Sequence, residues 1–195
     1  MHRSEDLSAA GWLTRTGADP MRLLTLGPAG FAAYARLRFI PDPDGPGLSE
    51  ADVELPEDHP SEIAQARAVL RGLAGHTQAP ERCYFCVWEG YSGSFLDPEL
   101  LANGPLLVLP HRRYVLFAGE LADIERWEAE FGGGRPCAPP AFVWPADHRW
   151  CFTSDVDPHW AGIGASAAAI ESLTARTDVD VVPASSDQAP PRYDS

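Results

Sequence analysis

The chain has 195 residues, of which 45% are hydrophobic, so one domain with a substantial buried core is expected and nothing demands a second. Its formal net charge of −13 argues against sequence-independent binding of nucleic acid, which needs a basic surface, and against contact with an anionic membrane. Its 15 basic residues are all arginine, which excludes a lysine Schiff base and a phosphate loop that carries lysine.

The number of cysteines and the length of the apolar runs indicate the cellular compartment in which the protein is expected. The sequence has four cysteines, no apolar run of 18 residues and no secretory leader. A low cysteine content is typical of proteins in reducing compartments, where thiols stay free. We therefore expect a cytoplasmic protein that makes no contact with a membrane.

The first forty residues predict short elements. Tyr34 to Ile40 alternates between two faces and indicates a strand. Trp12 would anchor a first helix, and Pro28 stands near the first position of a helical turn. The expected elements are a helix over 7–14, a strand or turn over 22–26, a helical turn over 27–31 and a strand over 34–40.

A long acidic loop follows, from Pro41 to Pro60. Residues 42–62 carry eight acids and no arginine. A solvated loop is the simpler interpretation of this charge run, and a binding element is the alternative. Ser61 and Glu62 then open a helix whose apolar residues keep helical spacing to residue 74.

The second half predicts most of the sheet. Strands are expected at 82–88, 106–109, 114–117, 141–144, 149–157 and 179–182, and helices at 120–131 and 165–173. The predicted fold class is α+β: a single domain over 1–183, with a mainly antiparallel sheet of about five to seven strands and helices packed on one face. Residues 184–195 lack apolar mass and are expected to form a disordered tail.

The segment from 139 to 173 holds three of the six tryptophans and a pair of glycines before a helix. We expect a loop over 159–164, with Ser166 in the first turn of the helix. Backbone amides at such a helix start can bind an anion, and Arg112 and Arg113 at a hairpin tip could add bidentate contacts. The alternative is a tight structural turn in which Ser166 caps the helix.

Asp155, Asp157 and His159 fall on one side of an extended chain, where they could converge on a cation, with His148 or His111 as a further ligand. The alternative is a strand end with solvated acids and a packed histidine. We expect no metal, because no second ligand spacing supports one.

Cys83 and Cys86 have the spacing of zinc ligands, but they lie in a predicted strand, where positions three apart face opposite sides. Cys137 and Cys151 do not form a second close pair. We therefore expect buried free thiols.

Some of these residues carry a resemblance to an uncharacterised family of actinobacterial proteins, and segments 84–90 and 109–114 look like upstream motifs of that family. The residues that resemble the family's segment are Trp144, Pro145, Asp147, Trp150, Cys151, Asp157, Trp160, Gly164 and Ser166. The resemblance covers residues 83–173 and implies an architecture and a lineage, but no mechanism. Similar segments also occur beside immunity-type proteins of the SUKH kind.

Two functions stay open at this point. One is a non-catalytic module of the immunity type that holds a basic protein partner through its acidic surface and a patch from Trp144 to Trp160. The other is a small enzyme or a protein that binds a small molecule or an anion at the 159–166 loop. No G-x-S-x-G motif occurs, so no catalytic residue can be assigned, and no cofactor is expected. The candidate ligand-binding residues are His111, Arg112, Arg113, Trp144, Asp155, Asp157, His159, Trp160, Gly162, Gly164 and Ser166.

Overall fold

The computed structural model describes residues 1–15, 17, 19–91, 95–185 and 187–193. The strands are β1 (His2–Arg3), β2 (Ala33–Arg38), β3 (Cys83–Trp88), β4 (Leu107–Leu109), β5 (Arg112–Gly119), β6 (Phe142–Pro145), β7 (Cys151–Thr153), β8 (Trp160–Ala165) and β9 (Val181–Ala184). The α-helices are α1 (Gly11–Arg15), α2 (Pro20–Leu26), α3 (Glu62–Leu73), α4 (Pro98–Ala102), α5 (Trp127–Glu130) and α6 (Ala167–Thr174). The 3₁₀ helices are η1 (Ser8–Ala10), η2 (Glu50–Asp52), η3 (Ala74–His76), η4 (Glu89–Tyr91) and η5 (Leu121–Arg126).

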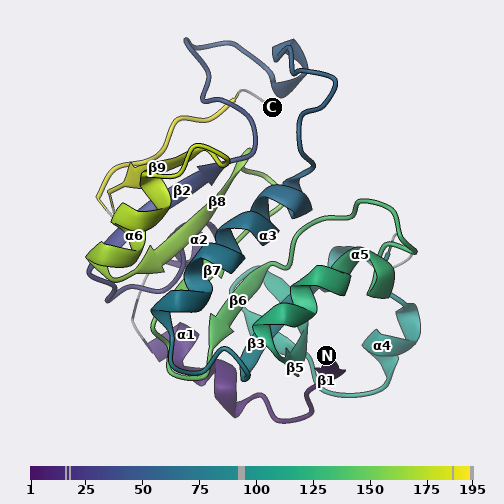
Figure 1. Cartoon of the computed structure of the whole chain (residues 1–195). Coiled ribbons are helices and arrows are strands. Elements are labelled where there is room, and N and C mark those ends of the chain that lie inside the picture. The colour runs from purple at the N-terminus through teal and green to yellow at the C-terminus, as the bar shows by residue number, and fades with distance from the viewer. Residues whose placement is uncertain (16, 18, 92–94, 186, 194–195) are drawn as a thin grey trace.

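The strands form one antiparallel sheet in the order β1-β5-β3-β6-β7-β8-β2-β9, and β4 pairs with β5 as a hairpin (Figure 1). Successive residues of each strand face opposite sides, so the sheet separates two cores. In β3, for example, Phe85 and Val87 belong to one core, while Cys86 belongs to the other. The α+β class and the antiparallel sheet predicted from the sequence are confirmed.

The first core contains the three predicted helical segments. Leu70 of α3, Ile124 of η5 and Ile170 of α6 are buried in it, and Figure 1 shows α3, α5 and α6 on the near side of the sheet. The second core, on the other face, is closed by α1 and α2 through Leu13 and Leu23. Helices therefore cover both faces, whereas the sequence pattern predicted them on one.

Helix α2 corrects the strand or turn predicted at 22–26. Asp19 caps the helix, because its Oδ1 accepts hydrogen bonds from the backbone amides of Met21 (3.0 Å) and Arg22 (3.1 Å), and Pro20 fills the first helical position. Gly27 then ends the helix with a φ of 89°. The helical turn predicted at 27–31 does not form.

Strand β8 corrects the loop predicted at 159–164. All six of its residues are buried, and it pairs with β2 on one side and β7 on the other. A Cβ at Gly162 would collide with the carbonyl oxygen of Thr25 and lie 2.6 Å from Cα of Leu26, and one at Gly164 would collide with the ring of Phe31. The two glycines therefore let α2 and Phe31 rest directly on the sheet.

The predicted acidic loop at 41–60 forms with η2 at its centre, and the last strand lies close to its predicted place. The strand predicted at 149–157 is shorter, since β7 covers only Cys151–Thr153. The disorder predicted for 184–195 stays a prediction, and residues 186, 194 and 195 lie outside those described. Tyr193 nevertheless lies against the body of the protein.

Because Gly162 of β8 faces helix α2, Gly162→Ala should lower the free energy of unfolding by about 1–3 kcal/mol, the usual cost of overpacking a core. Urea denaturation measures this. Gly75→Ala is the matched control, since a Cβ at Gly75 meets nothing within 4 Å. An equal effect of the two substitutions would show that β8 does not pack under α2.

Candidate functional site

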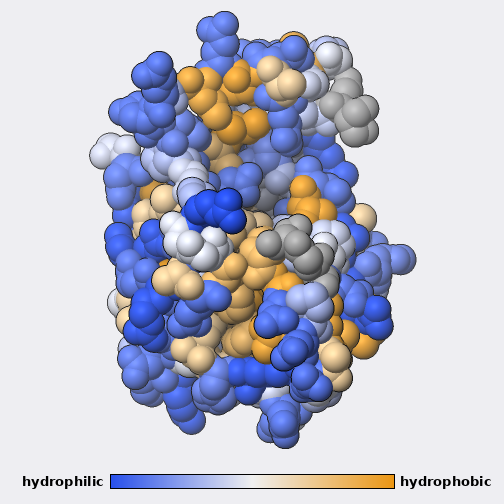
Figure 2. Space-filling view, turned by 90° about the vertical axis from the view of Figure 1, so that its right-hand side faces the viewer, coloured by the Kyte–Doolittle hydropathy of each residue, from blue (hydrophilic) through white to orange (hydrophobic). Residues whose placement is uncertain are grey.

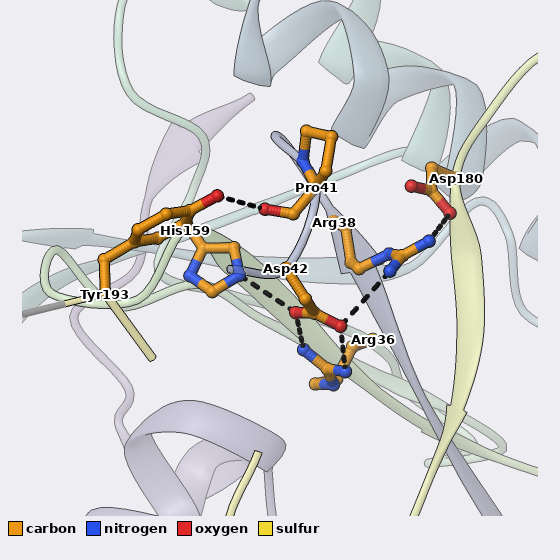
Figure 3. Close-up of polar contacts among 7 residues, drawn as sticks. All are labelled: Arg36, Arg38, Pro41, Asp42, His159, Asp180 and Tyr193. Atoms are coloured by element: carbon orange, nitrogen blue, oxygen red, sulfur yellow. Dashed lines mark hydrogen bonds and ion pairs between the residues drawn. The ribbon is translucent and has the colours of Figure 1, made fainter. Parts of the chain in front are cut away.

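Asp42 is the centre of a polar cluster where strand β2 runs into the acidic loop (Figure 3). Its carboxylate accepts two hydrogen bonds from Arg36, at 2.7 and 2.9 Å, and one from Arg38 at 3.2 Å. Nε2 of His159 lies 3.0 Å from the same carboxylate, and Arg38 also bonds Asp180 at 2.9 Å. Strand β2, the acidic loop and the residue just before β8 therefore meet at one carboxylate.

Burial and hydrogen bonding shift the pKa of Asp42 in opposite directions. Burial raises the pKa of a carboxyl group, but the hydrogen bonds from Arg36, His159 and Arg38 together outweigh burial and hold the pKa of Asp42 well below its usual range. An ionised carboxylate only accepts hydrogen bonds, so Nε2 of His159 must donate. Nδ1, on the ring edge away from Asp42, has no hydrogen-bond partner among the residues described.

Arg36 explains why the cluster exists. Its side chain is only 8% exposed and lies 5.4 Å from the ring centre of Trp160, so its charge needs a partner inside the protein. Asp42 supplies that partner in a bidentate geometry. The ion pair thereby fixes the start of the acidic loop against β2.

The end of the loop is fixed at almost the same place. His59 and Gln65 both donate to the carbonyl oxygen of Phe39, at 2.7 and 3.1 Å, and the amide of Phe39 donates to the carbonyl of His159 at 3.0 Å. The acidic loop is therefore an excursion whose two ends are tied to one point on β2. Figure 1 shows it extending away from the sheet.

A cleft of about 760 Å³ lies beside this cluster. Its walls come from α2, from the acidic loop, from the segment before β8 and from residues 192–193. The lining residues are Met21, Thr25, Ser49, Glu50, Asp155, Val156, Asp157, Pro158, His159, Arg192 and Tyr193. Three of its lining side chains, Glu50, Asp155 and Asp157, are acidic, and Arg192 adds a positive charge to the same lining.

Asp155 and Asp157 do converge on a cation, but it is a guanidinium. Arg112 lies 3.1 Å from Asp155 and 3.2 Å from Asp157, and its guanidinium sits 4.9 Å from the ring centre of Trp88. His159 turns away from them towards Asp42. In the described part of the chain, no group of three or more histidine, cysteine or acidic side chains could hold a metal ion.

Four of the predicted site residues lie away from the cleft because of strand β8. Trp160, Gly162 and Gly164 are buried in the strand, so they form no open loop. Ser166 is exposed at the start of α6 and caps it, since its Oγ accepts a hydrogen bond from the amide of Ala169 at 3.2 Å. Ser166 therefore caps helix α6, which was the alternative interpretation of this residue.

The remaining predicted residues are also separate from the cleft. His111 forms the exposed tip of the β4–β5 hairpin with a φ of 67°, and Arg113 pairs with Glu89 at 2.7 Å. Trp144 is fully buried and stacks on Tyr84, with ring centres 5.5 Å apart. Because Trp144 and Trp160 are both buried, the surface patch predicted between them does not exist.

The cysteines lie as the strand pattern predicted. Cys83 and Cys86 face different cores, and all four cysteines are free. Burial raises the pKa of the Cys83 thiol to about 12 and that of Cys137 to about 11, so neither forms a reactive thiolate near neutral pH.

Comparison with protein-family models found no match, and comparisons with the curated proteins and with the solved structures found none either. The site must therefore be interpreted from its own chemistry. Of the helices described, none is both long enough and apolar enough to span a membrane.

Replacing Asp42 should destabilise the protein strongly. Asp42→Asn leaves the buried Arg36 without an anion, and we expect a loss of about 2–3 kcal/mol in the free energy of unfolding at pH 7. Chemical denaturation measures it, and Asp44→Asn, which changes an exposed carboxylate of the same loop, should stay within about 0.5 kcal/mol.

Wild type and Asp42→Asn can also be compared as a function of pH, which tests whether the charge of Asp42 stabilises the fold. The folded pKa of Asp42 lies below the unfolded value of about 3.9, so its stabilisation is complete above that value and declines as the pH falls towards the folded pKa. The difference between wild type and Asp42→Asn should therefore be constant from pH 5 to 7 and shrink below about pH 4. A difference that stays the same at pH 3 would show that the charge of Asp42 is not what stabilises the fold.

Proposed function

We propose that this protein is a non-catalytic binding module for a basic protein partner, and that the cleft beside His159 receives a basic side chain of that partner. The observation that carries the proposal is the composition of the cleft, which Glu50, Asp155 and Asp157 all line, with Glu50 and Asp157 exposed. Arg112 is bound by two of these carboxylates, which shows that their geometry suits a guanidinium.

The acidic loop supports the same partner. Residues 42–62 carry eight acids and no arginine, and the net charge of −13 would steer a basic protein towards the module. Figure 2 shows hydrophobic residues gathered at the upper end of the molecule, where Figure 1 places this loop, and its exposed leucines are Leu48 (36% exposed) and Leu55 (41%). Carboxylates around exposed apolar side chains suit a partner that offers basic residues around apolar ones.

An anionic ligand is less well supported. The backbone of Gly162 and Gly164 lies inside the sheet, and Arg112 and Arg113 already pair with acidic side chains. An acidic module that binds a basic protein is also what an immunity-type inhibitor of a basic toxin requires. The cytoplasmic location expected from the cysteines stays a prediction.

His159 supports a second candidate function, a small enzyme that acts on a cationic small molecule. Its Nε2 is held by Asp42, which leaves the imidazole oriented and Nδ1 free to accept a proton. No described nucleophile bonds Nδ1, so we place binding before catalysis.

The proposal can be tested by titrating acetyl-tetra-arginine amide into the protein at low ionic strength in a calorimeter. Asp157→Asn and Glu50→Gln should each weaken binding about three- to fivefold, because each removes one exposed charge worth up to about 1 kcal/mol. Salt at about 0.5 M should weaken all of these interactions.

Glu57→Gln is the matched control, since Glu57 is an exposed carboxylate of the same loop that does not line the cleft. It should change the affinity less than twofold. If Glu57→Gln weakens binding as much as Asp157→Asn does, the peptide responds to the overall charge and the cleft has no special role. Agmatine, a small guanidinium compound, separates the two candidates: binding as tight as that of the peptide would favour the small molecule.

A further inference from the structure

The chain itself returns to this cleft after the last strand. It leaves β9 at Ala184 and reaches the cleft at Arg192 and Tyr193, which both line it. The Tyr193 hydroxyl donates to the carbonyl oxygen of Pro41 at 2.7 Å. Its ring meets the ring of His159 edge-on (Figure 3), and the ring centres lie 4.8 Å apart with the planes at 75°.

These contacts are few for a segment that covers the most buried polar group of the cleft. Residues 187–193 have no helix or strand, and Arg192 is exposed. A single neutral hydrogen bond and one aromatic edge contact are modest interactions in water, because water competes for the same groups. Tyr193 can therefore leave the cleft without disturbing the fold.

Residues 187–193 do not neutralise the acidic side chains that line the cleft. Glu50, Asp155 and Asp157 line the same cleft as Arg192, yet within the described ranges Arg192 forms no ion pair. The cleft therefore holds an arginine next to an aromatic ring. A second chain could place the same two kinds of side chain there and also form the ion pair that Arg192 does not make among the described residues.

From this placement we infer that Arg192 and Tyr193 are an internal substitute for the partner, and that the partner inserts a basic residue followed by an aromatic one. This inference rests on the proposed function, because it assigns the partner segment of the same cleft. The partner's aromatic ring takes the position of Tyr193 on His159 and its basic side chain meets the carboxylates, so binding must displace Tyr193.

The test uses the full chain and the peptide acetyl-Pro-Pro-Arg-Tyr-amide, which repeats residues 190–193. Its affinity is measured by NMR through the ring signals of His159, for wild type and for Tyr193→Ala. The docked segment lowers the apparent affinity by the fraction of molecules whose cleft is open. Tyr193→Ala should therefore bind the peptide at least about threefold more tightly than wild type does.

Two controls make the result specific. Gln188→Ala changes an exposed residue of the same segment and should behave like wild type. The peptide acetyl-Pro-Pro-Arg-Ala-amide lacks the aromatic ring and should bind more weakly to both proteins.

The outcomes separate this inference from the proposed function. Equal affinity of wild type and Tyr193→Ala for the tyrosine peptide would overturn the internal substitute and leave the proposed function standing. Binding of tetra-arginine but not of the tyrosine peptide would overturn the whole inference, because the peptide repeats the docked segment, and would leave the proposed function standing. If neither peptide shifts the signals of His159, both the inference and the proposed function are wrong.

Discussion

The ion pair between Arg36 and Asp42 is the interaction on which the rest of the site depends. A strand that carries an arginine on a nearly buried position needs an anion close by, and the acidic loop provides it as soon as the chain leaves β2. Once Asp42 is fixed there, it also receives Arg38 and orients His159. The loop is then held over the segment before β8, and the two together enclose the cleft. A change at this carboxylate should therefore affect stability and binding together, because one group supports both.

A second constraint comes from the two glycines of β8. Without side chains at Gly162 and Gly164, helix α2 and Phe31 approach the sheet so closely that they form part of the second core. Helix α2 also supplies Met21 and Thr25 to the wall of the cleft, so the position of this wall depends on backbone contact inside the sheet. The glycines therefore affect the site indirectly: they allow α2 to pack on the sheet, and α2 lines the cleft. They do not contact a ligand themselves.

The local patterns of the sequence were enough to predict β2, β3, α3 and the hairpin, because each has a clear period of two or of 3.6 residues. Strand β8 could not be predicted in this way. Glycine is unfavourable in strands, and only contact with α2, far away in the sequence, explains Gly162. Asp155, Asp157 and His159 were considered as a group that could converge on one cation, and they do line one cleft. Arg112 pairs with the two carboxylates, however, and His159 bonds Asp42, and these partners were not foreseen. Asp42 is one of eight acids in a charge run, and no local feature marks it as the one that turns inward. The available signal was Arg36, which together with Arg38 places two charges in a short strand and so required a counter-ion.

We propose that a basic partner binds in the cleft beside the Asp42 cluster. The most direct test of this claim is a map of backbone amide shifts by NMR as acetyl-tetra-arginine amide is added to the isotope-labelled protein. We predict that the largest changes fall on residues 49–50, 155–157 and 159, with smaller ones on Met21 and Thr25 of α2. A different apolar groove of about 390 Å³, lined by Ala74, Pro80 and Leu121 with Glu81, Glu120 and Glu125 at its edge, offers a competing location. Changes confined to that groove, or spread evenly over all acidic surfaces, would contradict the claim.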